Sequence, residues 1–148
     1  MTPRPIKRYT CFISYSSKDE KFAKKLHADL QARGVNVWFA PHDMTIGARI
    51  RPTIDASIRS YDKLLLILSK DSVTSQWVEQ EVETALAKER ELSTTALFPI
   101  RLDDSIMGIK AGWGGFILNT RNIGDFTDWK SPSSYQKALD RLLRDLIA

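Results

Sequence analysis

The amino-acid sequence predicts an α/β fold in which the strands of one parallel sheet alternate with helices that cover both of its faces. Segments typical of strands and of helices alternate along the chain, and residues 63–68 are nearly all leucine and isoleucine, which is typical of a central strand buried on both faces. The chain has 148 residues, enough for one hydrophobic core and short for two domains. We therefore expect a single domain at residues 9–148, preceded by an N-terminal extension of residues 1–8.

The first part of the chain predicts a strand, a helix and a second strand. Residues 9–14 are rich in aromatic and branched side chains, which favours a strand. The next segment begins with the Ser17-to-Glu20 spacing of a capping box, repeats apolar residues every four positions and stops at Gly34, which together predict a helix. Residues 35–39 are then expected to form the second strand.

The middle of the chain predicts a long loop and two further helices on either side of the central strand. Residues 40–49 contain proline, histidine, aspartate and glycine, which predicts an irregular loop. A second helix follows, with Pro52 tolerated in its first turn and isoleucine at every fourth position. Either Thr74 or Ser75 can cap a third helix that runs to about Leu92.

The last part of the chain predicts two more strands and a final helix. Residues 96–100 are expected to form the fourth strand. Residues 103–121 contain four glycines and show no clear period. A short fifth strand is expected at residues 122–123. Ser133 and Gln136 can cap the final helix. The apolar face of that helix is expected to consist of Tyr135, Ala138, Leu139, Leu142, Leu143 and Leu146.

Five such units suggest a flavodoxin-like, five-stranded parallel sheet with strand order 2-1-3-4-5, flanked by helices on both faces. In that order the chain changes direction across the sheet between strands 1 and 3, and ligands bind outside the carboxyl ends of strands at such a switch point. The expected walls of the site are residues 14–19 and 69–81, with the loop of residues 40–49 beside them.

Composition argues against several classes of partner. The 22 basic and 18 acidic residues give a net charge of +4 and are spread along the chain, so nucleic-acid binding is not expected. The longest apolar run, residues 64–68, is far shorter than the ~20 residues that cross a bilayer, and no secretion signal is recognisable, so we expect no membrane partner. The single cysteine, Cys11, lies in a strand-like segment and predicts a buried thiol in a cytoplasmic protein.

Several familiar chemistries lack their required residues. The acidic pair and the phosphoacceptor aspartate of a receiver domain are replaced by Tyr15-Ser16 and Ser69-Lys70, and no nucleophile elbow, phosphate loop or dinucleotide-binding glycine motif is present. The two histidines, His27 and His42, have no paired ligands, so neither a metal nor a resident cofactor is expected.

The third predicted helix carries three glutamates whose positions differ. At about 100° per residue, Glu81 lies about 85° from the centre of the apolar stripe, on the same flank as Trp77 one turn earlier. Glu79 lies at a similar angle on the opposite flank and Glu83 points further outward. Helix geometry narrows the choice without settling it, because acidic residues are also favoured near a helix N-terminus and Trp77 could be a core anchor.

Four ordered segments carry a resemblance to a known family, and the match covers about residues 9–147. They are residues 12–19 (FISYSSKD), residues 38–44 (WFAPHDM) followed by Gly47, residues 75–81 (SQWVEQE) with Ala85, and Asp125-Phe126 with Trp129. In this combination the chain resembles the Toll/interleukin-1 receptor (TIR) domain, in particular the bacterial type. Ordered motifs at domain-wide spacing are more specific than any one of them alone.

The resemblance implies the five-stranded fold already expected and one of two functions. TIR domains are either adaptors that assemble through TIR–TIR contacts or enzymes that cleave NAD+ between nicotinamide and ribose. In the enzymes a glutamate on the third helix, four residues after a tryptophan, is essential, and this position is Glu81. By the same resemblance the substrate-binding residues are Tyr15, Ser16, Phe39, Gly47 and Trp77.

The implied chemistry suits a site with a single carboxylate. Nicotinamide in NAD+ is already a cationic leaving group, so no general acid is needed, and one carboxylate can stabilise the positive charge that develops on the ribose. The products would be nicotinamide and ADP-ribose or a cyclic isomer, with NAD+ as substrate and no cofactor. The chain departs from some of the enzymes at Ala40, where they have an acidic residue, and near Ser16, where they have an arginine, and both departures bear on rate and product.

The alternative is a non-catalytic module that assembles through residues 40–49. A carboxylate of Glu81 that faces an open cleft beside Tyr15 and Phe39 would favour the enzyme, whereas a carboxylate sealed by packing would favour the module. Enzymes of the family often complete the pocket with a neighbouring copy, so we also expect self-association. The resemblance further implies a role in bacterial immune defence or signalling.

Overall fold

The computed structural model describes residues 10–39, 63–73, 76–92, 95–110 and 112–147. The expected extension of residues 1–8, the loop of residues 40–49, the second helix and the cap at Thr74 or Ser75 lie outside the described residues. Everything below concerns the described part of the chain.

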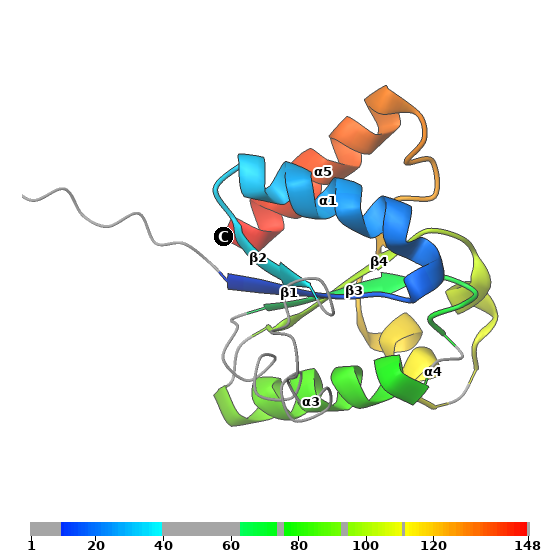
Figure 1. The fold of residues 1–148 in the computed structure, drawn as a ribbon. Helices are drawn as coiled ribbons and strands as arrows, with labels where there is room; N and C mark the ends of the chain where they lie inside the picture. The colour runs from blue at the N-terminus through cyan, green and yellow to red at the C-terminus, as the bar shows by residue number, and fades with distance from the viewer. Residues whose placement is uncertain (1–9, 40–62, 74–75, 93–94, 111, 148) are drawn as a thin grey trace, which may run out of the picture.

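A parallel sheet of five strands forms the centre of the fold (Figure 1). The strands are β1 (Thr10–Ser14), β2 (Asn36–Phe39), β3 (Lys63–Leu68), β4 (Leu97–Arg101) and β5 (Gly124–Asp125). Their order is β2-β1-β3-β4-β5 and every neighbouring pair is parallel, which confirms the predicted topology and its switch point between β1 and β3.

Helices cover both faces of the sheet. They are α1 (Glu20–Ala32), α3 (Gln76–Leu92), α4 (Gly112–Thr120) and α5 (Pro132–Ile147), with short 3-10 segments η1 (Ser17–Asp19) and η2 (Ser105–Gly108). Figure 1 shows α1 and α5 together on one face, and α3 and α4 on the other. None of the helices in the described ranges is long and apolar enough to cross a membrane.

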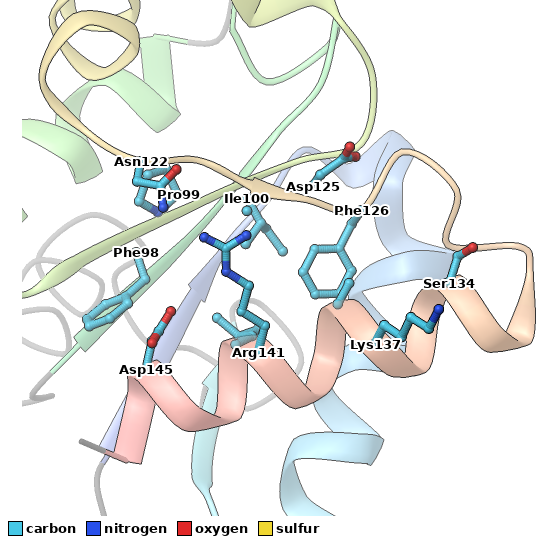
Figure 2. A pocket seen from close by; sticks show the side chains of 13 residues that line it. Phe98, Pro99, Ile100, Asn122, Asp125, Phe126, Ser134, Lys137, Arg141 and Asp145 are labelled. Atoms are coloured by element: carbon cyan, nitrogen blue, oxygen red, sulfur yellow. The ribbon is translucent and has the colours of Figure 1, made fainter.

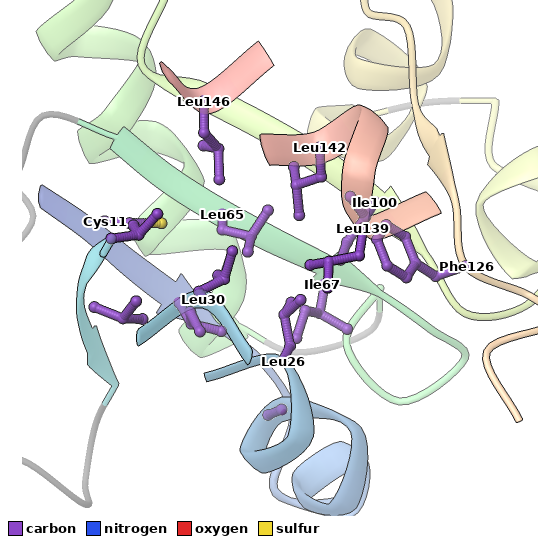
Figure 3. Close-up of a cluster of buried hydrophobic side chains, with 14 of the residues drawn as sticks. Cys11, Leu26, Leu30, Leu65, Ile67, Ile100, Phe126, Leu139, Leu142 and Leu146 are labelled. Atoms are coloured by element: carbon purple, nitrogen blue, oxygen red, sulfur yellow. The ribbon is translucent and has the colours of Figure 1, made fainter. Parts of the chain in front are cut away.

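The sheet divides the hydrophobic core into two layers. Side chains of Ile13, Leu65 and Ile67 pack with α1 and α5 (Figure 3), whereas Phe12 and Leu66 pack with α3 and α4. Successive residues of a strand point to opposite faces, so this division follows directly from the strand period. Both layers are needed because the central strands are apolar on both sides.

The ends of α1 correct one prediction and confirm another. Ser16, not Ser17, is the capping residue: its Oγ accepts the N–H of Lys18 at 3.4 Å, and the chain makes one 3-10 turn before α1 begins. The predicted capping box was wrong because that extra turn separates Ser17 from the start of the α-helix. Gly34 has a φ of 84° and stops the helix as expected.

The segment after β4 also differs from the sequence prediction. Helix α4 was not predicted, because its mostly apolar sequence gives no helical period and its glycines argue against a helix. The fifth strand lies at Gly124–Asp125, two residues later than expected. Helix α5 begins at Pro132, before the expected cap at Ser133, because proline fits the first helical position.

Candidate functional site

The buried polar side chains of the described part of the chain gather at the carboxyl ends of β1 and β3. They are Ser14, Ser69, Ser72 and Glu81, at 1%, 2%, 0% and 2% exposure. Ser14 ends β1, Ser69 directly follows β3, and Glu81 lies in the second turn of α3. Polar groups are expensive to bury, so their concentration at the predicted switch point marks this region as the candidate site.

Glu81 is distinguished from the neighbouring glutamates by its burial. It is buried beside the apolar face formed by Val78 and Val82, whereas Glu79 is half-buried and Glu83 is exposed. Glutamate is almost never fully buried unless its carboxylate is stabilised, so a buried carboxylate requires an explanation beyond helix propensity. Side-chain burial thus distinguishes the three glutamates, between which helix geometry alone could not choose.

Ser14 belongs to the expected wall of residues 14–19, although the sequence analysis did not single it out. It follows Phe12 by two residues and therefore points to the α3 side of the sheet, where its register partner is Leu66. Its hydroxyl is buried and makes no hydrogen bond to any described residue. A serine within a strand does not stand out in the sequence. Its position on the α3 side of the sheet is visible only in the structure.

The remaining predicted residues are not all brought together. Tyr15 is half-buried and packs against the core on the α1–α5 side, on the other layer from α3. Ser16 caps η1. Phe39 ends β2 opposite Ile13 in the register, and Trp77 lies in the first turn of α3. Gly47 lies outside the described residues, as do the side chains of Phe39 and Trp77.

Two described cavities lie away from these residues. A cavity of about 360 Å³ is bounded by β4, β5 and α5, with Phe98, Ile100 and Phe126 among its apolar walls and Arg141 beside them (Figure 2). A second, of about 180 Å³, lies next to it and includes Trp129. Neither of these two cavities is lined by Glu81, whose side chain is 2% exposed.

A hydrogen bond that the sequence did not reveal joins the two expected walls. The hydroxyl of Ser69 donates to Oδ2 of Asp19 at 2.5 Å, across 50 residues of sequence. Burial raises the pKa of the Asp19 carboxyl above its ordinary value; the hydrogen bond from Ser69 partly opposes this, and the charges of Asp71 and Asp103 raise it further. Contacts over such a separation leave no local signal in the sequence.

Cys11 and the metal-ligating residue types in the described ranges give no sign of a reactive thiol or a metal site. Cys11 is buried, as expected, and burial raises the pKa of its thiol to about 12, which makes it unreactive at neutral pH. Within the described ranges no group of three histidine, cysteine, aspartate or glutamate residues could hold a metal ion.

Curated proteins similar to this chain include enzymes that act on NAD. A 2′ cyclic ADP-D-ribose synthase from Acinetobacter baumannii is 33% identical over 88 residues, which are 59% of this chain and 33% of that protein. A synthase of the same name from Bacteroides thetaiotaomicron is 31% identical over 59% of this chain and 31% of its own. An NAD(+) hydrolase from Escherichia coli is 27% identical over 53% and 26%, respectively. The chain thus spans about a third or less of these relatives.

Solved structures and a family model agree on the fold. The TIR domains of the Roq1 resistosome align with a TM-score of 0.74 at 17% identity, covering 93% of this chain and 99% of theirs. The TIR domain of a Toll-related receptor from Hydra magnipapillata aligns with a TM-score of 0.70 at 16% identity, covering 93% and 98%. The family model described as "TIR domain" matches residues 11–143, and the chain therefore belongs to the TIR domain family.

Proposed function

We propose that this TIR domain cleaves NAD+ between nicotinamide and ribose, releasing nicotinamide and either ADP-ribose or a cyclic isomer. The observation that carries the proposal is the buried carboxylate of Glu81, at the switch point of the sheet and four residues after Trp77. Relatives named as cyclic ADP-ribose synthases and NAD(+) hydrolases support the same reaction class. Retaining a buried carboxylate opposes stability, which is typical of a residue kept for function.

In the proposed reaction the carboxylate of Glu81 acts by position and charge. The bond between C1′ of the ribose and the nicotinamide nitrogen breaks, its electron pair leaves with nicotinamide, and positive charge develops on the ribose. A carboxylate held in a poorly hydrated site stabilises that charge far more than it would in water. Water then attacks C1′ and releases a proton to give ADP-ribose, or a hydroxyl of the same molecule attacks and closes the ring.

We assign the substrate-binding role to Tyr15, Ser16, Phe39, Gly47 and Trp77, the positions that the family resemblance supplies. NAD+ is the substrate, and the mechanism uses no metal and no resident cofactor. The buried hydroxyl of Ser14 is a further polar group on the α3 side of the sheet. We also place the reaction in the cytoplasm and in bacterial immune defence or signalling; the single buried thiol and the bacterial relatives support this.

The decisive test is Glu81→Gln in concentrated protein incubated with NAD+. We expect nicotinamide release to fall by about 100-fold or more, because loss of a group that stabilises transition-state charge has effects of that order. Glutamine preserves the volume and removes a buried charge, so thermal stability should be unchanged or higher.

Glu83→Gln is the matched control, because Glu83 is exposed on the same helix. It should release nicotinamide at the wild-type rate. Undiminished release by Glu81→Gln, or no release by the wild-type protein at any concentration, would contradict the proposed mechanism.

The second candidate is a module that signals by TIR–TIR assembly without turnover. A structural relative is described as the TIR domains of a resistosome, and a Glu81 side chain with 2% exposure needs no contact with a substrate in such a module. This candidate predicts that substitutions within residues 40–49 abolish self-association while Glu81→Gln changes nothing measurable.

A further inference from the structure

The hydrogen bond from Ser69 to Asp19 connects the segment that follows β1 to the turn that leads into α3. We propose that Asp19 is a positioning residue, whose carboxylate fixes these two segments against each other and thereby sets the placement of Glu81. The inference rests on the proposed function and deepens it, because it adds a residue that acts on the same site through the backbone.

Ser69 is held so that its hydroxyl can donate only in one direction. Its Oγ accepts the N–H of Ser72 at 3.2 Å, while its own N–H donates to Oγ of Ser72 at 2.8 Å and its carbonyl accepts the N–H of Val73 at 3.0 Å. The hydroxyl proton is therefore committed to Asp19. Both serines are buried, so this small network has little freedom to rearrange.

Each end of the bond lies in a segment that is followed or preceded along the chain by a proposed site residue. Asp19 closes the 3-10 turn that Ser16 caps, directly after Tyr15. Ser69 opens the turn from which the chain passes into α3, where Glu81 lies in the second turn. Loss of the bond would let these segments move apart, and misplacement of a reacting group by as little as ~1 Å can lower a rate about 100-fold.

An asparagine in place of Asp19 could also join these segments through its neutral amide. It would avoid the unfavourable burial of a negative charge that the carboxylate carries. The charges of Asp71 and Asp103, in the turns after β3 and β4, act on Asp19. Two cations accompany this cluster: the Nζ of Lys18 lies 3.9 Å from Asp71, and Lys70 acts on Asp103. Burial raises the pKa of Asp19, so its ionised form opposes folding at neutral pH. The negative charge of Asp19 nevertheless strengthens the hydrogen bond from Ser69, because charge-assisted hydrogen bonds are about twice as strong as neutral ones.

The first measurement is hydrogen exchange of Asp19→Asn. We expect unchanged or higher thermal stability, together with exchange about tenfold faster in residues 15–19, in residues 69–73 and in the first turns of α3. Glu83→Gln is the matched control, because it removes an exposed carboxylate on α3 and leaves the bond between Asp19 and Ser69 in place. It should leave exchange in these segments unchanged. Wild-type exchange in Asp19→Asn would overturn the proposal.

The second measurement is nicotinamide release, with wild type and Glu81→Gln assayed in parallel. We expect Asp19→Asn to lower kcat about tenfold with little change in KM, and Ser69→Ala to do the same. The double variant should be no worse than Ser69→Ala alone, because both substitutions act on the same interaction. Wild-type kcat in Asp19→Asn, where Glu81→Gln is inactive, would overturn the positioning role alone.

An inactive wild type would contradict the proposed function, and the exchange measurement would then decide whether Asp19 positions α3. Unchanged exchange in residues 76–81 of Asp19→Asn would overturn that role, whatever the activity of the wild type.

Discussion

At Gly115, helix α4 lies close to the backbone of the preceding segment. A Cβ at this position would lie 2.8 Å from the carbonyl carbon of Lys110 and 2.9 Å from its oxygen, and backbone atoms cannot move aside cheaply. We expect Gly115→Ala to lower the free energy of unfolding by about 1–3 kcal/mol, as overpacking does elsewhere, in a urea denaturation experiment.

Gly108→Ala provides the control for that measurement. A Cβ at Gly108 would meet nothing within 4 Å, and its backbone is not in the left-handed region. Alanine should therefore be neutral there or stabilise the protein by up to about 1 kcal/mol, through the entropy of the unfolded chain. Equal effects of the two substitutions would contradict the packing argument.

At the scale of single residues, the sequence indicated which residues are candidates for the site better than it indicated how buried they are or what they contact. Helix geometry placed Glu81 on a flank of α3 and could not choose between it and Glu79, since the burial of a flank depends on what packs there. The Toll/interleukin-1 receptor resemblance supplied the choice, and the burial of Glu81 agrees with it. Ser14 and Asp19 were expected only as members of a wall, because their individual contacts depend on strands and turns that meet only in the folded sheet.

At the scale of elements, Glu89 fastens the end of α3 to the start of β4 and to the segment after α4. Its carboxylate accepts the N–H groups of Ala96 at 2.8 Å and Leu97 at 2.9 Å, and it pairs with both terminal nitrogens of Arg121. Burial alone would raise the pKa of Glu89, but the hydrogen bonds from Arg121 and from the two backbone N–H groups hold it below its ordinary value.

This arrangement predicts a specific loss of stability in acid. Because the folded protein binds the proton of Glu89 more weakly than the unfolded chain does, the carboxylate stabilises the fold above the ordinary pKa of about 4.5, and this contribution disappears as the pH falls through the lower folded value. Glu89→Gln should lower the free energy of unfolding at neutral pH by about 2 kcal/mol and make it less dependent on pH below 5.

Glu91→Gln is the comparison for that experiment, because Glu91 is exposed on the same helical turn and should show neither effect. Denaturation curves recorded between pH 3 and pH 7 would provide the measurement. An unchanged acid profile in Glu89→Gln would contradict the assigned role.

The elements that were predicted correctly are those whose residues show a clear period. The aromatic and branched composition of β1, the continuous apolar run of β3 and the four-residue repeat of α1 are each local signals. Helix α4 fails this test because it is apolar on several sides and begins with glycines that allow close contact with residues 109–110. The fifth strand was misplaced by two residues because a strand of two residues carries almost no pattern of its own.

At the scale of the whole molecule, one sheet and its helices account for nearly all of the described chain. Helices α3 and α4 cover the face of the sheet on which Ser14 lies, and the two described cavities lie at the edge formed by β4, β5 and α5. A carboxylate with 2% exposure cannot reach the ribose of a dinucleotide without a change in its surroundings. A second copy of the domain is the partner that the family resemblance implies.

If assembly is what gives NAD+ access to Glu81, the rate of nicotinamide release per molecule should depend on protein concentration. We expect it to rise at least about tenfold across the range in which light scattering shows oligomers forming, since mass action then increases the population of the competent state. Substitutions within residues 40–49 should lower oligomerisation and activity together, whereas Lys24→Ala, on the exposed side of α1, should change neither. A monomer with constant activity per molecule would show that the site is complete within one chain and that a rearrangement inside the domain exposes Glu81.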